Sequence, residues 1–315
     1  MKKQSLLKIF PETEYPTEYL ISRLKGRKSR FITKWEIILE SPEPSSKLSS
    51  ENKSKNIQDV FFDKEMYWIY SQMNKKLKKT FHSIFFFREI KRVIACMRLR
   101  AQGKKDEELV ELLKFSLLNK NLKKIITEES SLVNIMQAVE KELLFESNKF
   151  EGLTVHMKKN ELKIPEHKIF DTFFQNINNK HPVLIKYFQM QIDGINIVSL
   201  HRTFRWNEET TDFLTGGSIP KEVFFKIQAS EDEKALENLT AKIFYADKKQ
   251  FITETLENVI LSGLLKAAKK FLHWYTNIGY ILYYILLLQI ETINTGLLLL
   301  SHKKDVDFLR KRLIV

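Results

Sequence analysis

The sequence has few of the residues that end helices or cross-link a fold. Its 315 residues include only 9 glycines and 7 prolines. A β-rich architecture needs many turns, so this shortage favours long helices. The single cysteine, Cys96, excludes an internal disulfide and a zinc site made of several cysteines, and it fits a reducing compartment. With 43% hydrophobic residues, the chain is nevertheless long enough to bury a full core.

Motifs that would indicate an enzyme are missing as well. The sequence contains no GxxxxGK(S/T) phosphate loop, no GxGxxG after a strand, and neither HExxH nor GxSxG. Its seven histidines are scattered without the spacing of metal ligands. The stretch after Met1 offers only a short apolar patch, so we expect no signal peptide. We therefore expect no catalytic residue, no cofactor and no metal ion.

Long apolar runs are rare, and the most apolar one is Ile278–Leu288. Gln289 and Glu291 close this run, whereas a membrane-spanning helix needs about twenty apolar residues. We expect a helix buried in the protein core. The alternative is a membrane anchor over 278–300, which predicts that the purified chain needs detergent.

Positive charge is what the sequence has in excess. Lys and Arg number 52 against 39 Asp and Glu, a formal net charge of +13. Nucleic acid, an acidic protein surface and anionic lipid are all compatible partners. The densest run comprises Arg23, Lys25, Arg27, Lys28 and Arg30, beside Phe31 and Trp35. Such interleaving suits single-stranded nucleic acid, but no RNP, KH or zinc-finger pattern accompanies it, and a solvated helix face explains it as well.

A pattern of an acid, two residues and a polar residue recurs in three apolar stretches. The copies are Glu89-x-x-Arg92, Asp193-x-x-Asn196 and Glu291-x-x-Asn294. Successive copies stand about 100 residues apart, which indicates a repeated structural module. The first and third are each followed by a stretch that begins Lys-Lys-Asp, at Lys104 and Lys303. We therefore predict three similar units.

The second copy shows how the acid and the polar residue are related in space. Pro182 is suited to begin a helix, and Asp193 and Asn196 are then neighbours on its surface. A carboxylate among apolar residues needs hydrogen-bond donors from a neighbouring segment, because unpaired burial is costly. One copy alone is explained by a solvated face, whereas three copies favour a shared structural role.

Helical periodicity covers most of the remaining chain. It predicts helices over 19–39, bent around Gly26, and over 61–77, 81–100, 109–118, 122–126, 132–144, 169–177, 235–245 and 251–271. Asn148–Lys163 is more ambiguous, as a loop or a short hairpin. Ser41–Asp59 is poor in apolar residues, so we expect a flexible loop that proteases cut first. Gly216-Gly217 before Pro220 marks a turn.

The sequence resembles that of the C subunits of the archaeal and bacterial V/A-type rotary ATPases, whose eukaryotic counterparts are the d subunits. The matching residues are Tyr19, Arg23, Gly26, Lys28 and Arg30, then Asp193, Asn196 and Arg202, the turn Leu214–Pro220, and the final helices Tyr283–Leu313. The similarity covers nearly the whole chain apart from 41–59. Three positions depart from the family pattern. Arg92 stands where the family usually has Asn, Gly296 stands where an Arg often follows the third Asn, and Leu300 replaces the Arg of the second copy.

The resemblance implies an all-α fold of three lobes around a central cavity, a funnel. The lobes would be 1–115, 116–215 and 216–315. The protein would sit on the cytoplasmic face of the membrane ring of proteolipids, touch the membrane only peripherally and receive the foot of the central rotor shaft. It would transmit torque without catalysis, cofactor or nucleic acid. The polar positions of the repeats would be structural: Glu89, Arg92, Asp193, Asn196, Arg202, Glu291 and Asn294.

A basic helical nucleic-acid-binding protein is the alternative reading of the charge. Its binding would fall steeply with salt, because neutralising phosphates releases counterions. Neither reading decides whether the complex would move protons or sodium ions, or whether it would run as a synthase or a pump.

Overall fold

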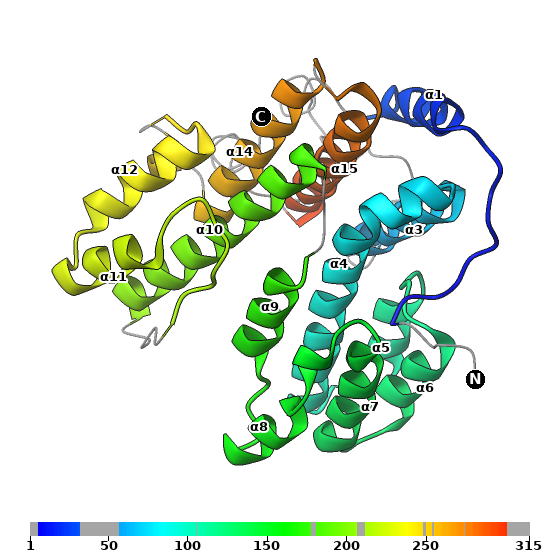
Figure 1. The fold of residues 1–315 in the computed structure, drawn as a ribbon, viewed down its shortest axis with the longest axis horizontal. Helices are drawn as coiled ribbons and strands as arrows, with labels where there is room; N and C mark the ends of the chain where they lie inside the picture. The colour runs from blue at the N-terminus through cyan, green and yellow to red at the C-terminus, as the bar shows by residue number, and fades with distance from the viewer. Residues whose placement is uncertain are drawn as a thin grey trace. The chain divides into compact units, whose positions relative to one another are not determined.

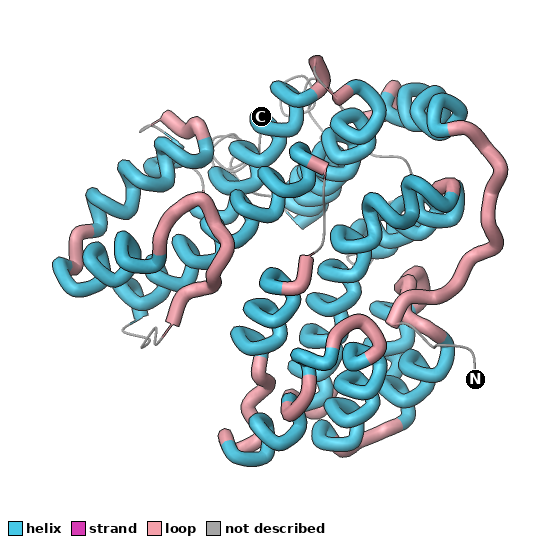
Figure 2. The backbone as a smooth tube through the Cα atoms, in the orientation of Figure 1, coloured by secondary structure: helices cyan, strands magenta, loops and turns pink. Residues whose placement is uncertain are grey.

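The computed structural model describes residues 6–31, 57–104, 106–177, 181–206, 212–247, 250–253, 255–273 and 275–300. Within these ranges the chain forms helices joined by loops, and it contains no strand (Figures 1 and 2). The β pairing found there is an isolated antiparallel bridge between Leu7 and Leu118. The predicted all-α class is confirmed.

The chain packs into two compact units, each made of two separate stretches. The first unit comprises Met1–Tyr15 and Asp63–Asn179, and the second unit comprises Pro16–Phe62 and Lys180–Val315. The backbone therefore crosses from one unit to the other three times. The division into three lobes of about 100 residues, and the funnel they would form, stay predictions.

The helices of the first unit follow one another through short loops. They are α3 (Ile57–Gln72), whose first residues belong to the second unit, α4 (Lys75–Ala101), α5 (Asp106–Leu113), α6 (Lys120–Glu128), α7 (Leu132–Leu144), the 3-10 turn η2 (Asn148–Phe150), α8 (Leu153–Lys159) and α9 (Glu166–Gln175). In the loop predicted over 41–59, residues 41–56 lie outside the described ranges, while the last three residues begin α3.

Several helix boundaries differ from the predicted ones because a polar side chain caps the helix. Asn74 Oδ1 accepts a hydrogen bond from Leu77 N at 3.0 Å, so α4 begins well before the predicted residue 81. Thr255 caps α14 through Asn258 N at 3.3 Å, which splits the predicted helix 251–271 in two. Hydrophobic periodicity alone does not reveal these caps.

The segment Asn148–Lys163, which was ambiguous in sequence between a loop and a short hairpin, contains the 3-10 turn η2 and helix α8 joined and followed by turns. The carboxylate of Glu140 on α7 accepts hydrogen bonds from Gly152 N at 2.5 Å and from Thr154 N at 2.8 Å. The hydroxyl of Thr154 donates to the same carboxylate. Backbone N–H groups at the start of α8 are thereby satisfied by a distant acid, a contact that local sequence does not show.

An aromatic cluster joins α4 to α9 in the first unit. The ring of Phe87 lies 5.1 Å from that of Phe173 and 5.0 Å from that of Phe174, measured between centroids. Phe85 faces Tyr70 of α3 at 4.7 Å. The Phe85-Phe86-Phe87 run thus turns its rings toward two neighbouring helices, because successive residues of a helix point in different directions.

The second unit contains the remaining helices. They are α1 (Thr17–Lys28), α10 (Pro182–Trp206), α11 (Lys221–Ser230), α12 (Glu233–Phe244), α13 (Gln250–Thr253), α14 (Leu256–Phe271) and α15 (Thr276–Leu300). Helix α15 packs against α14 and α1, and α14 also packs against α10 and α12 (Figure 1). Gly26 lies inside α1, which ends at Lys28, and residues 32–39 of the predicted first helix lie outside the described ranges.

Helix α15 contains the most apolar run of the chain. Its side chains at Ile281, Leu282, Tyr284, Ile285 and Leu286 are buried within the protein. Among the described residues, no helix is both long enough and apolar enough to span a membrane. The prediction of a buried core helix over Ile278–Leu288 is confirmed.

Two glycines allow helices of the second unit to approach closely. A Cβ placed on Gly263 of α14 would stand 2.6 Å from the carbonyl oxygen of Phe244, the last residue of α12. One placed on Gly194 of α10 would stand 3.0 Å from Cγ2 of Ile260 on α14. Any side chain at position 263 would therefore push α12 and α14 apart.

Candidate functional site

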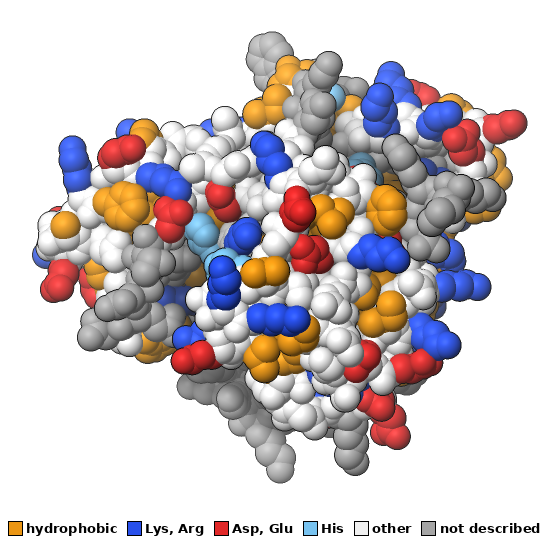
Figure 3. All heavy atoms as spheres, turned by 60° about the horizontal axis from the view of Figure 1, so that its bottom comes forward, with side chains coloured by type: hydrophobic (Ala, Val, Ile, Leu, Met, Phe, Trp, Pro, Cys, Tyr) orange, Lys and Arg blue, Asp and Glu red, His pale blue; other side chains and the backbone are white. Residues whose placement is uncertain are grey.

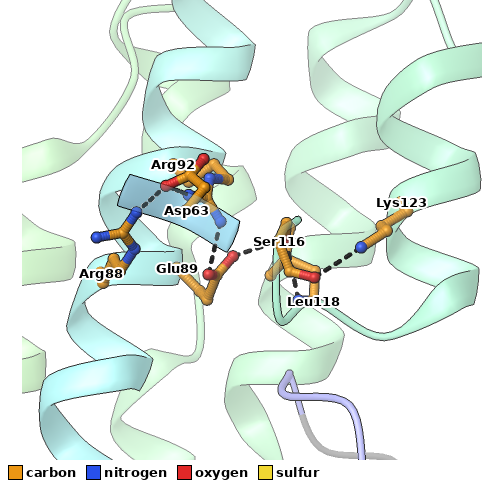
Figure 4. Close-up of polar contacts among 7 residues, drawn as sticks. All are labelled: Asp63, Arg88, Glu89, Arg92, Ser116, Leu118 and Lys123. Atoms are coloured by element: carbon orange, nitrogen blue, oxygen red, sulfur yellow. Dashed lines mark hydrogen bonds and ion pairs between the residues drawn. The ribbon is translucent and has the colours of Figure 1, made fainter. Parts of the chain in front are cut away.

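The first copy of the repeated pattern is buried and ionic. Glu89 on α4 is fully buried, and its Oε1 pairs with Arg92 Nη1 at 2.7 Å (Figure 4). Its Oε2 accepts a hydrogen bond from Ser116 Oγ at 2.7 Å. Ser116 lies in the loop between α5 and α6, so the acid joins a long helix to a downstream loop.

Asp63 on α3 completes this first brace, which we define as Asp63, Glu89, Arg92 and Ser116. Arg92 Nη2 lies 2.5 Å from Asp63 Oδ1, and Arg88 pairs with the same oxygen. Two carboxylates therefore face two guanidinium groups. Balanced charges with good hydrogen bonds are the condition under which buried ions are tolerated, and removing one partner leaves the other uncompensated.

The loop side of the first brace is also fixed. Ser116 Oγ accepts from Leu118 N at 3.0 Å, and Lys123 Nζ on α6 donates to Ser116 O at 2.7 Å. Burial lowers the pKa of Lys123, against the opposing effect of the nearby Glu89 carboxylate. Asn119 N in turn donates to Leu6 O at 3.0 Å. The brace thereby links α3, α4, α6 and the N-terminal segment of the first unit.

The second copy lies in the second unit and uses backbone groups. Asp193 on α10 is fully buried, and its Oδ2 accepts from Ser218 N at 3.0 Å and from Ser218 Oγ at 2.5 Å. Its Oδ1 accepts from Ile219 N at 3.2 Å. Burial raises the pKa of Asp193 above its ordinary value, although these hydrogen bonds act in the opposite direction.

Asn196 holds the same loop one turn further along α10. Its Nδ2 donates to Leu214 O at 3.0 Å, and its Oδ1 accepts from Leu214 N at 2.8 Å. The side-chain amide thus satisfies both backbone groups of one loop residue. Asp193, Asn196, Leu214 and Ser218 form what we call the second brace.

Glycines shape the predicted turn Leu214–Pro220 so that it reaches the second brace. Gly216 has φ of +93°, in the region that favours glycine. A Cβ on Gly217 would overlap the Asp193 carboxylate. The Gly-Gly pair therefore lies in a turn, as predicted, and this turn brings Ser218 onto a buried acid.

The two braces share one relationship that the sequence patterns did not reveal. Each acid accepts a hydrogen bond from a serine hydroxyl in a downstream loop, 27 residues away for Glu89–Ser116 and 25 residues away for Asp193–Ser218. They differ at the fourth position, where Arg92 reaches a carboxylate and Asn196 reaches backbone. Asp63 is thus the counter-charge that accompanies Arg92. A serine at matching distance from each acid was a usable signal.

The third copy lies on α15 of the second unit. Asn294 is fully buried and Glu291 is half-buried. The similar stretch that begins at Lys303 lies outside the described ranges. Arg202, near the end of α10, is exposed, and its guanidinium lies 5.9 Å from the ring centroid of Trp206. Its predicted role with the polar positions of the repeats stays a prediction.

Other candidate groups fall into structural roles. Cys96 is buried on α4, and burial raises the pKa of its thiol to about 12, so the thiol stays protonated. Across the described ranges, His, Cys, Asp and Glu side chains do not gather in groups of three or more that could hold a metal ion.

The described part of the chain is thus built of helices, and buried polar side chains fix two of the long ones to downstream loops. Residues 53–295 match the family model described as ATP synthase (C/AC39) subunit. The match covers well over half of the chain, so the protein belongs to this family, the C or d subunits of V/A-type rotary ATPases. No curated protein sequence matches the chain.

Proposed function

We propose that the chain is a non-catalytic central-stalk subunit that couples the rotor shaft to the membrane proteolipid ring. Membership of the C/AC39 family supports a place in a rotary ATPase complex. The partners proposed from this membership are the central shaft subunits and the ring. The proposed location is peripheral, on the cytoplasmic side of the membrane.

The observation that carries the mechanical part of this proposal is the recurrence of the braces. Glu89 and Asp193 each fix a helix of 25 residues or more to a loop through buried hydrogen bonds. Leaving a buried polar group unsatisfied costs about 1–3 kcal/mol, so sliding a helix past its loop is opposed at both places. Resistance to such shear is what a torque-transmitting element requires.

The proposal separates two activities of the intact complex. ATP hydrolysis by the catalytic head would not need this chain, whereas ion pumping driven by ATP would need it. The resemblance to the family also implies that the shaft enters a cavity between three lobes, and this arrangement is part of the proposal.

A depletion and add-back experiment tests the proposal. The complex is assembled with and without the chain, and ATP hydrolysis and ATP-driven ion uptake into vesicles are measured on both. We expect hydrolysis without uptake in the depleted complex and restored uptake when the chain is added. A tagged pull-down from solubilised membranes should recover shaft and ring subunits. Hydrolysis by the isolated chain, or uptake by the depleted complex, would contradict the proposal.

A further inference from the structure

Helix α1 and the residues that follow it carry a dense excess of positive charge. The basic side chains, which we call the basic run, are Arg23, Lys25, Arg27, Lys28 and Arg30. Lys25 and Arg30 are exposed, and the others are half-buried. On the face drawn in Figure 3, Lys and Arg side chains are interspersed with Asp and Glu. The acid within α1 is Glu18, one turn before the run.

The opposite face of α1 fixes the direction in which the basic run points. Leu20, Ile21 and Leu24 are buried, and α1 packs against α15. Asn277 Nδ2 donates to Glu18 Oε1 at 3.1 Å, which ties down the start of the helix and occupies its acid. The exposed face is therefore held in place and is cationic.

Tyrosine rings lie among these cations. Lys28 Nζ lies 4.8 Å from the ring centroid of Tyr283, and Lys25 Nζ lies 5.9 Å from that of Tyr280. The side chain of Tyr19 is 41% exposed. Tyrosine beside lysine and arginine is the composition found at the headgroup level of membranes, where an amphipathic ring and a cation both find partners.

We propose that the basic run on the exposed face of α1 and just beyond its end, with the exposed Lys25 and Arg30, binds the anionic phospholipid headgroups of a bilayer. Each exposed cation near such a surface adds electrostatic attraction, and no deep insertion is needed. This inference concerns the chain by itself and does not rest on the proposed role as a stalk subunit.

The character of this face favours lipid over an acidic protein. The centre of a stable protein–protein interface is depleted in charged residues and contains apolar anchors. In α1 the aliphatic side chains Leu20, Ile21 and Leu24 are all buried against the protein, so the outer face offers charged, small polar and tyrosine side chains and no aliphatic anchor. A headgroup layer accepts such a face without an apolar anchor.

Vesicle co-sedimentation of the full chain tests the inference. Vesicles of neutral phosphatidylcholine are compared with vesicles containing about 30% phosphatidylserine, at about 100 mM salt and above. We expect binding to the anionic vesicles only, and weaker binding as salt rises. The double variant Lys25→Glu/Arg30→Glu should bind at least about tenfold more weakly, and Lys25→Gln/Arg30→Gln should lie between it and the wild type.

A matched control separates this face from net charge. Lys158 and Lys159 are exposed at the end of α8 in the first unit. Lys158→Glu/Lys159→Glu makes the same change in total charge and should alter binding by less than about twofold, with an unchanged melting temperature confirming the fold of each variant. An equal loss in the control would overturn the inference. So would equal binding to neutral vesicles, or release of the protein from vesicles by an oligonucleotide or polyglutamate of matched charge concentration.

Discussion

Gly217 lies so close to Asp193 that a Cβ at position 217 would overlap the carboxylate and stand 3.1 Å from its Cγ. The backbone of the turn can donate hydrogen bonds to this buried acid only because position 217 has no side chain. A substitution at Gly217 therefore tests whether the second brace stabilises the second unit.

Gly217→Ala should lower the free energy of unfolding by about 1–3 kcal/mol, because the turn must move off Asp193 or strain around it. Chemical denaturation monitored by circular dichroism measures this. Gly26→Ala is the matched control, since no atom lies within 4 Å of a Cβ there and the glycine is inside α1. That variant should gain about 0.5–1 kcal/mol. Equal effects of the two substitutions would be evidence against the brace.

The first brace predicts a large cost for removing Glu89. Glu89→Ala leaves Arg92 buried with part of its charge uncompensated and Ser116 without its acceptor, so we expect a loss of about 3–5 kcal/mol. Glu108→Ala removes an ion pair to Lys104 whose side chains are 48% exposed, and should cost less than about 0.5 kcal/mol. Both are measured by urea denaturation. A small effect of Glu89→Ala would mean that the brace is not structural.

Arg92 and Asp63 should be energetically coupled. Arg92→Asn places at position 92 the residue type that Asn196 has in the second brace, but it leaves Asp63 with Arg88 alone. In the double variant Asp63→Asn/Arg92→Asn, the carboxylate that lost Arg92 is also removed. The double variant should therefore lose less unfolding free energy than the sum of the two single losses, by about 0.5–3 kcal/mol. A double-mutant cycle of unfolding free energies measures the coupling. Simple additivity would show that Asp63 is not the partner that makes arginine acceptable.

Asp193 should make stability depend on pH in a direction opposite to that of a salt-bridged acid. Because burial raises its pKa in the folded state above the ordinary 3.8, the folded protein holds this proton more tightly than the unfolded chain. The stabilisation is complete below the unfolded pKa and is lost as pH rises through the folded pKa. In Asp193→Asn this titration is absent.

The unfolding free energies of the wild type and of Asp193→Asn are measured at about pH 4 and about pH 7. Titrations that the two proteins share cancel in the difference between them. The stability of the wild type relative to the variant should be higher at the lower pH. The reverse trend would show that the three hydrogen bonds from Ser218 and Ile219 outweigh burial and hold the pKa down.

Local patterns were sufficient for some of this structure and insufficient for the rest. The spacing of Asp193 and Asn196 predicted neighbours on one helix, their recurrence in three copies favoured a structural role, and Gly216-Gly217 predicted the turn. The partners Ser116 and Ser218 were missed because they lie 27 and 25 residues after their acids, so only a comparison of the two copies, and no local pattern, points to them. The α8 helix was missed for a similar reason, since the acid that satisfies its first N–H groups lies in α7.

Arg92 shows a different limit of sequence reasoning. Its place in the pattern was recognised as unusual for the family, but its counter-charge Asp63 lies on another helix. Only the packing of α3 on α4 brings these two charges together. The charge run of α1 was likewise visible as composition, whereas its exposed direction depends on which residues α15 buries.

The docking of α1 on α15 has a consequence for how the protein is made. Glu18 and Asn277, which are hydrogen-bonded, are 259 residues apart in sequence. The ribosome therefore releases α1 long before the helix that covers its Leu20 and Leu24 exists. Until α15 has been synthesised, these apolar side chains are exposed unless another protein binds them. Contacts between residues so far apart in sequence also form slowly. We expect nascent chains that end before α15 to bind chaperones through α1, and completion of α15 to release them.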